Sequence, residues 1–192
     1  MRKIAKDYYQ NLLNLIQAVK VTDKNGKALD FYEGIEETAA LIVKKGAAGN
    51  KLIFIGNGAS AAISSHIATD FWKNGGIKAI AFNDASLLTC VSNDFGYRYV
   101  FSKPIEMFSE TGDILIAISS SGRSENILLG AKSAKKKGCR IVTLSGFDKN
   151  NPLRKLGDVN FYVSSASYGH VEVVHHSICH CLVDMIIEKK NG

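Results

Sequence analysis

The sequence predicts an α/β fold: a three-layer α-β-α sandwich with a five-stranded parallel sheet and extra N-terminal helices. Five short apolar runs, typical of strands buried on both faces, alternate with stretches that carry apolar residues at helical spacing. The chain has 192 residues, 46% of them apolar, which suits one domain with a substantial core. We therefore expect a single domain, with N-terminal helices in residues 1–48 and the α/β core in residues 49–192.

The N-terminal segment is expected to form two helices. Apolar side chains recur at helical spacing in residues 7–22 and in residues 34–46. Between them, residues 23–27 read Asp-Lys-Asn-Gly-Lys, and the Asn25-Gly26 pair is typical of a turn tip.

The core is expected to alternate strands and helices. Strands are predicted at residues 52–55, 79–82, 114–119, 140–145 and 160–163, and helices at residues 59–72, 124–137 and 171–189. Such alternation is typical of a parallel sheet covered by helices on both faces.

The distribution of charged and apolar residues favours neither nucleic acid nor a membrane as a partner. The net charge is +6, but the lysines are dispersed apart from residues 135–137, a run that suits a solvated helix end. Without a groove-reading motif, nucleic acid is not an expected partner. No apolar run approaches the roughly 18 residues of a membrane helix, and residues 1–17 mix charged with apolar positions. A cytoplasmic protein is therefore expected.

The four cysteines, Cys90, Cys139, Cys179 and Cys181, stand in apolar contexts and form no C-x-x-C pair. They indicate neither a disulfide framework nor a cysteine zinc site. We expect them to be buried thiols.

A glycine-rich turn follows the first predicted core strand. Residues 53–60 read Ile-Phe-Ile-Gly-Asn-Gly-Ala-Ser, a strand that runs into small residues opening a helix. This geometry points backbone N–H groups at an anion. The segment lacks the third glycine of a dinucleotide fingerprint and the Gly-Lys-Ser/Thr of a phosphate-binding Walker loop. Alone, it predicts a plain tight turn as readily as an anion site.

A serine-rich turn follows the third core strand and is more specific. Ser119, Ser120, Ser121 and Ser124 surround Gly122 where a helix is expected to begin. Their hydroxyls, added to the helix N-terminus, suit a phosphate monoester. The alternative is that Ser121 or Ser124 caps the helix, with Glu125 in its first turn. Since a cap needs one serine, four of them favour phosphate binding.

Histidines and carboxylates recur on two predicted helices. His66 and Asp70 are four residues apart, and so are Glu172, His176 and His180 in succession. Residues at this spacing share a helix face. If the two faces converge, their imidazoles and carboxylates suit Zn²⁺ or a similar divalent ion. The alternative is a set of solvated or hydrogen-bonded polar side chains.

Together these motifs resemble the SIS (sugar isomerase) domain family, which has a flavodoxin-like fold. Strand-Gly-Asn-Gly-x-Ser and the later Ser-x-Ser-Gly-x-Ser carry the resemblance, which spans nearly the whole chain. Residues 90–96, Cys-Val-Ser-Asn-Asp-Phe-Gly, resemble the phosphoheptose isomerase branch in particular. By position, the resemblance implies that the substrate and its phosphate are bound by Asn57, Gly58, Ser60, Asp94, Ser119, Ser120, Ser121 and Ser124.

The resemblance also implies one Zn²⁺, or another divalent metal, per subunit. The family's ligands align with His66, Asp70, Glu172 and His180. Asp70 stands where the family has a Glu that is also its proposed base, and Glu172 stands where it has a Gln. Asp70 or Glu172 is therefore the expected base, and we favour Glu172. Of His175 and His176, we expect one to support the ligands and the other to face solvent or a neighbouring subunit.

The resemblance implies an aldose-ketose isomerase that converts sedoheptulose 7-phosphate to glycero-manno-heptose 7-phosphate through a metal-assisted enediol. Glu172, His180 and Asp70 are the expected catalytic residues. A homotetramer is implied, with the N-terminal helices packed on the core or on a neighbouring subunit. Two alternatives stay open: a non-catalytic SIS protein that senses sugar phosphates or associates with a replication initiator, and an isomerase of another ketose phosphate. Asp70 and Arg123 are where altered specificity would be sought.

Overall fold

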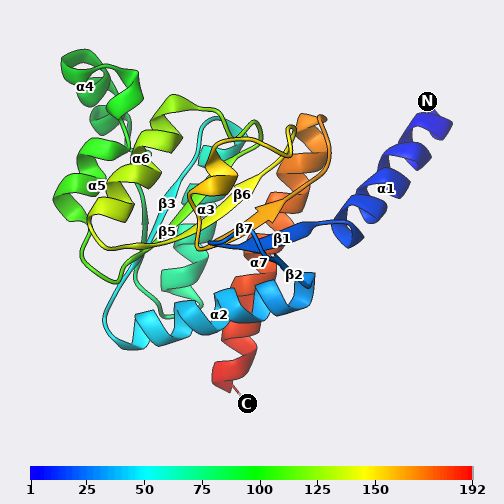
Figure 1. The fold of residues 1–192 in the computed structure, drawn as a ribbon, viewed down its shortest axis with the longest axis horizontal. Coiled ribbons are helices and arrows are strands. Elements are labelled where there is room, and N and C mark those ends of the chain that lie inside the picture. The colour runs from blue at the N-terminus through cyan, green and yellow to red at the C-terminus, as the bar shows by residue number, and fades with distance from the viewer. Residues whose placement is uncertain (192) are drawn as a thin grey trace.

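The computed structural model of the chain describes residues 1–191 and confirms the α/β fold (Figure 1). A seven-stranded sheet, in the order β2-β1-β7-β6-β5-β3-β4, lies at its centre. In chain order the elements are α1 (Arg2–Gln17), β1 (Lys20–Asp23), β2 (Ala28–Leu29), α2 (Phe31–Ala47), β3 (Leu52–Ile55), α3 (Ala59–Lys73), β4 (Ala79–Ala81), α4 (Ala85–Phe95), the 3-10 turn η1 (Tyr97–Tyr99), α5 (Ser102–Phe108), β5 (Ile114–Ser119), α6 (Glu125–Lys136), β6 (Arg140–Ser145), the 3-10 turn η2 (Leu153–Lys155), β7 (Val159–Tyr162) and α7 (Tyr168–Asn191).

The five predicted core strands form the parallel part of the sheet, as expected. The prediction missed β1 and β2, which add an antiparallel edge beside β7. The expected helix over residues 7–22 is therefore wrong at its end, since α1 stops at Gln17. Val19 and Val21 are buried while Lys20 is exposed, and this alternation is the pattern of a strand with one covered face. The predicted turn at Asn25-Gly26 is confirmed, with Gly26 at φ 81°.

Helices cover both faces of the sheet, so the three predicted layers are present. Alternate strand residues point to opposite faces. On one face, Phe54 and Ile116 pack with the apolar sides of α2, α3 and α7. On the other face, Ile55 and Leu115 pack with α5 and α6.

The strand order reverses between β3 and β5. The chain passes from β3 to β4 on one side and from β5 to β6 and β7 on the other. In open α/β sheets, ligands bind in the crevice beyond the carboxyl ends of the strands at such a reversal. At this point Gly56 follows β3, and a Cβ there would collide with the backbone of Ser60. The close approach of turn and helix therefore requires glycine at position 56.

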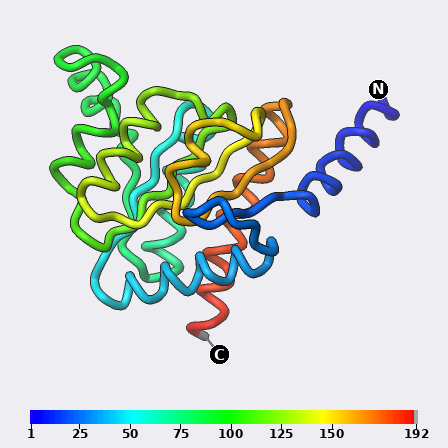
Figure 2. The backbone as a smooth tube through the Cα atoms, viewed as in Figure 1, coloured from blue at the N-terminus to red at the C-terminus, as the bar shows by residue number. Residues whose placement is uncertain are grey.

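Helix α1 stands away from the sheet (Figure 2) and has no buried residue. It contacts α7 through Tyr8, whose ring stacks on that of His170 at 4.3 Å between centroids. Within residues 1–191, no helix is both long and apolar enough to cross a membrane.

The expectation of four buried thiols is half wrong. Cys139 and Cys179 are buried, whereas Cys90 and Cys181 are exposed. Cys90 lies on α4, which has no buried residue, and this helix was absent from the prediction.

Candidate active site

A pocket of about 240 Å³ lies beyond the carboxyl ends of β3 and β5, at the reversal of the strand order. Seven of the eight predicted substrate-binding residues line it, together with Ala59, Tyr168 and Glu172; the seven are Asn57, Gly58, Ser60, Ser119, Ser120, Ser121 and Ser124. The structure thus brings the glycine-rich and the serine-rich turns together around one small polar cavity.

Two helices begin at this pocket. Helix α3 starts after Gly58, and helix α6 starts after Ser124. Neither first turn receives a hydrogen bond from a capping side chain. Ser124 occupies the capping position, yet its hydroxyl makes no cap bond, which argues against the capping alternative. Uncapped helix starts present free N–H groups and a partial positive charge, which attract an anion.

The side chain of Asn57 is fixed by two residues that the sequence did not single out. Asn57 and Asn126 exchange two hydrogen bonds, each 2.9 Å, and Tyr97 Oη donates to Asn57 Oδ1 at 3.0 Å. The backbone N–H of Ile127 donates to Asn126 Oδ1 at 3.0 Å, which sets the orientation of the Asn126 amide. Asn57 Nδ2 therefore has one N–H in this pair and a second one left for a ligand.

Three imidazoles lie together beside the pocket. His66 comes from α3, and His176 and His180 come from α7, so the two helix faces converge as predicted. Their ligand atoms lie within 4.8 Å of one another. The ring centroid distances are 5.5 Å for His66–His176, 5.4 Å for His66–His180 and 4.6 Å for His176–His180.

The surroundings of His176 indicate that this cluster suits a metal. Its Nε2 is buried and has no hydrogen-bond partner among the described residues. Burial, and then the neighbouring His180 and His66, lower the pKa of His176. The ring is therefore neutral near pH 7, which is the form that binds metals. A bound cation would satisfy the unpaired nitrogen, so the residues present fit a divalent ion.

The two predicted carboxylate ligands lie apart from each other. Asp70 Oδ2 is 3.3 Å from His66 Nε2, while Glu172 lines the serine pocket. Among the described residues, neither belongs to the set of mutually close ligand atoms.

His175 points away from the cluster. It is fully buried, and its Nε2 lies 3.2 Å from the carbonyl oxygen of Ser145 at the end of β6. Burial lowers the pKa of His175 to about 4. Of the two adjacent histidines, it is therefore the structural one, while the half-buried His176 faces the cluster.

Comparison with known proteins identifies the family. A family model described as SIS domain matches residues 7–146. The chain belongs to the SIS domain family. Within that family it is 35% identical to the phosphoheptose isomerase of Proteus mirabilis, over 80% of this chain and 83% of the relative. It is 38% identical to the phosphoheptose isomerase of Tolumonas auensis, over 81% of this chain and 83% of the relative. These relatives place it in the phosphoheptose isomerase branch.

Solved structures of SIS proteins have the same fold. The phosphoheptose isomerase GmhA of Neisseria gonorrhoeae superposes with a TM-score of 0.82 at 25% identity, covering 96% of this chain and 98% of that one. A phosphoheptose isomerase from Francisella tularensis gives a TM-score of 0.85 at 24% identity, with 98% of each chain covered.

Two residues of this SIS chain differ from the predicted arrangement. Asp94 does not line the pocket; it lies exposed on α4, where its carboxylate contacts Cys90 and Asn93. Tyr168 lines the pocket but was not predicted, because the last helix was expected to begin at residue 171 and begins one turn earlier.

Arg123 was considered as a position of altered specificity. Its guanidinium is 2.6 Å from Asp148, so this charge is engaged within the chain.

Proposed function

We propose that this SIS protein is an aldose-ketose isomerase that converts sedoheptulose 7-phosphate to glycero-manno-heptose 7-phosphate, in heptose biosynthesis. The observation that carries the proposal is the pocket at the strand reversal, where uncapped helix starts and serine hydroxyls meet a carboxylate and a histidine cluster. The printed names of relatives at 35% and 38% identity support the substrate.

In this proposal the two turns hold the phosphate. Ser121 and Ser124 offer hydroxyls, and the starts of α3 and α6 offer backbone N–H groups. Anchoring the non-reacting phosphate positions the distant C1 and C2, so this binding contributes to turnover as well as to affinity. Asn57 adds the N–H that its pair with Asn126 leaves free.

Glu172 is the proposed base. Glu172 lies in the pocket with the serines, where its carboxylate would take the proton from one carbon and return it to the next through an enediol. Asp70 contacts His66 and stands outside the pocket lining, which favours Glu172 over Asp70 for this role.

The histidine cluster is the proposed site of Zn²⁺ or another divalent metal. When bound, such an ion supplies a Lewis acid that stabilises negative charge on the substrate oxygens. Nitrogen ligands from neutral imidazoles suit zinc.

NMR-monitored turnover of sedoheptulose 7-phosphate tests the proposal. We expect the aldose 7-phosphate to form with the purified, zinc-loaded protein, and the C2-position proton to exchange with solvent deuterium. Glu172→Ala should lose about 10²–10⁴-fold in turnover and still bind the sugar phosphate. Fructose 6-phosphate serves as the comparison substrate; faster turnover of it would indicate an isomerase of another ketose phosphate.

A binding protein without catalysis is the second candidate. The solved structure of the Vibrio vulnificus NanR protein complexed with ManNAc-6P shares the fold at 18% identity and a TM-score of 0.69. Tight sugar-phosphate binding with no turnover and no proton exchange would establish that candidate and refute the isomerase.

The proposal includes a homotetramer in the cytoplasm. An apolar groove between α2 and α7, lined by Phe31, Ile35 and Met185 among others, supports subunit contact, as does the apolar side of α1 with Ile4, Tyr9 and Leu13 exposed. The free thiols suit a reducing compartment. Light scattering of the purified protein should give the mass of four chains.

A further inference from the structure

Two residues of α7, Glu172 and His176, are candidates for the same metal-ligand position at the histidine cluster. Glu172 and His176 are successive members of the face that carries His180. We propose that the metal is held by three imidazoles, those of His66, His176 and His180, and that Glu172 is free of the metal and serves the substrate. This inference rests on the proposed isomerase and changes the ligand set that the sequence predicts: His176 takes the place of Glu172, and Asp70 does not bind the ion.

The first observation is the geometry of the rings. The three imidazoles are mutual neighbours, with centroids 4.6–5.5 Å apart, and one ligand atom from each lies within 4.8 Å of the other two. Nitrogens on one tetrahedral zinc are about 3.4 Å apart. Small side-chain rotations therefore bring the set to bonding distance.

The second observation is the state of His176 Nε2, which is buried without a hydrogen-bond partner among the described residues. Buried polar atoms in folded proteins are nearly always paired. The imidazoles of His66 and His180, which also bind metals, lie beside this ring. A cation between the three rings accounts for the unpaired nitrogen of His176. His175 Nδ1 is also buried and unpaired, but His175 belongs to no cluster of metal-binding side chains among the described residues.

The third observation separates Glu172 from the cluster. Four residues of helix rise about 6 Å, so Glu172 lies one turn from His176 toward the start of α7. There it lines the pocket with Ser119, Ser121 and Tyr168. The carboxylate thus lies where the sugar phosphate is proposed to bind, and His176 and His180 lie about one and two turns further along α7.

Asp70 completes the arrangement as a positioning residue. Its Oδ2 is 3.3 Å from His66 Nε2, and a carboxylate bonded to a ligating histidine fixes the orientation of that ring. Three neutral protein ligands leave a fourth position open, as in catalytic zinc sites. They also leave the double positive charge of the ion uncompensated, which strengthens it as a Lewis acid.

A crossed pair of substitutions tests the inference. His176→Ala and Glu172→Ala are compared with wild type for Zn²⁺ affinity by chelator competition, and for the visible absorption of bound Co²⁺, which reports the ligand set. We expect His176→Ala to weaken zinc by more than the 10–100-fold typical of outer-shell changes, and to alter the Co²⁺ spectrum. Glu172→Ala should keep the wild-type affinity within about threefold and the wild-type spectrum, because no ligand of the ion is removed.

Two further variants keep the test decisive. His170→Ala removes a histidine from the same helix outside the cluster and should bind zinc as wild type does. His176→Gln preserves side-chain volume if the alanine variant unfolds, and it should show the same loss.

The reverse pattern, in which Glu172→Ala loses zinc and His176→Ala keeps it, would overturn the inference, and so would a wild-type protein that binds neither metal. Failure of the proposed isomerase looks different: zinc binding would depend on His176, but sedoheptulose 7-phosphate would not be turned over.

Discussion

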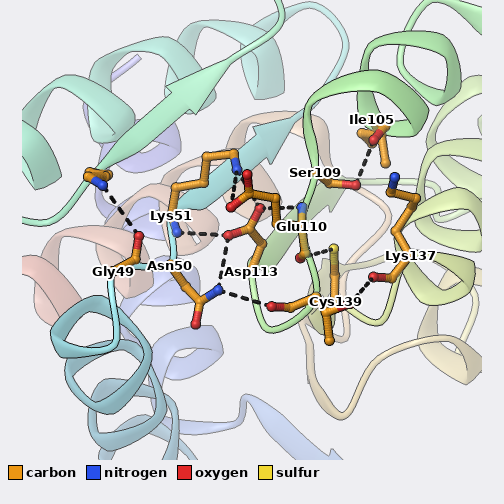
Figure 3. A network of polar contacts seen from close by, with 11 residues as sticks. Gly49, Asn50, Lys51, Ile105, Ser109, Glu110, Asp113, Lys137 and Cys139 are labelled. Carbon is orange, nitrogen blue, oxygen red and sulfur yellow. Dashed lines mark hydrogen bonds and ion pairs between the residues drawn. The ribbon is translucent and has the colours of Figure 1, made fainter.

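Polar groups at the two ends of the parallel strands differ in their partners: at the amino end they bond to one another, and at the carboxyl end they line a cavity. At the amino edge, Asp113 precedes β5 and is fully buried. Its carboxylate accepts hydrogen bonds from the backbone N–H groups of Lys51 at 2.9 Å and Glu110 at 2.8 Å, and pairs with Lys51 Nζ at 2.7 Å (Figure 3). Asn50 donates to the neighbouring carbonyl of Thr111 at 3.1 Å. These groups satisfy one another.

At the carboxyl edge, polar groups converge on a cavity instead. The helices that begin there, α3 and α6, have no capping side chain. Two other helices are capped: Asp30 forms a capping box with Glu33 at α2, and Asp84 accepts from Leu87 N at α4. Helices α1 and α5 have no capping side chain either. The pocket differs from these other starts because two uncapped helix starts meet there beside serine hydroxyls.

The two sets of polar groups therefore have different roles, one in stability and the other in ligand binding. A closed polar network stabilises the fold, because each buried group has a partner. An open one leaves donors for a ligand, and a ligand then supplies the missing bonds. The amino edge should accordingly respond to mutation in stability, and the carboxyl edge in activity.

The largest stability effect is expected for Asp113→Ala. The change removes the acceptor of two backbone N–H groups and leaves the half-buried Lys51 ammonium with only the exposed Glu110 carboxylate, 3.9 Å away. The expected cost is about 3 kcal/mol in the free energy of unfolding. Urea denaturation measures it. The control is Asp7→Ala, which breaks the exposed Lys3–Asp7 pair and should cost less than about 0.5 kcal/mol. Equal losses in the two variants would remove the distinction between a closed network and a surface ion pair.

Ser121→Ala is the corresponding test at the carboxyl edge. Ser121 Oγ accepts from Arg123 N at 3.2 Å, so its hydroxyl proton is free for the substrate phosphate. Loss of one charge-assisted hydrogen bond, about 2 kcal/mol, should lower kcat/KM about 30-fold, with the free energy of unfolding unchanged. Ser177→Ala, at an exposed position of α7, should leave both unchanged. A Ser121 variant that is destabilised yet fully active would contradict the assignment of the pocket.

Features that depend on the order of nearby residues, such as the parallel strands and the histidine-bearing helix faces, could be predicted from the sequence. Apolar runs located all five parallel strands, because strands buried on both faces are nearly continuous in apolar residues. Helical spacing placed His66 and His180 on faces that do converge. The antiparallel β1 and β2 were missed, because Val19 also fits the helical spacing of Leu12 and Ile16, and only pairing with β7 decides between helix and strand.

Other features depend on contacts distant in sequence, which no local pattern encodes. The bonds from Tyr97 and Asn126 to Asn57 span 40 and 69 positions. The unequal roles of His175 and His176 depend on which side of α7 meets β6, and the tilt of that helix is set by packing. Adjacent histidines look alike in sequence, yet one is fully buried and the other faces the cluster.

Tyr97→Phe is expected to have a smaller effect than the serine substitution. It removes only the hydroxyl that donates to Asn57 Oδ1, while Asn126 still holds the amide. A loss of about 1 kcal/mol corresponds to a roughly fivefold rise in KM, with kcat nearly unchanged because no reacting atom is touched. Tyr99→Phe, in the same 3-10 turn, is the matched control. A large fall in kcat for Tyr97→Phe would mean that the hydroxyl contacts the reacting atoms directly.

The smallest effect is the protonation of Asp113. Burial raises the pKa of this carboxyl, but the hydrogen bonds and the charge of Lys51, with the Glu110 N–H, outweigh burial and lower it below the ordinary value. The unfolded chain therefore takes up a proton at higher pH than the folded chain does. The stabilisation is complete above about pH 4, the ordinary range of an aspartate, and is lost as the pH falls through the folded pKa. Urea denaturation from pH 6 downward should show the stability gap between wild type and Asp113→Asn narrowing in acid. A gap that stays constant would mean that the carboxylate charge contributes nothing at this edge, and that only its shape and hydrogen bonds matter.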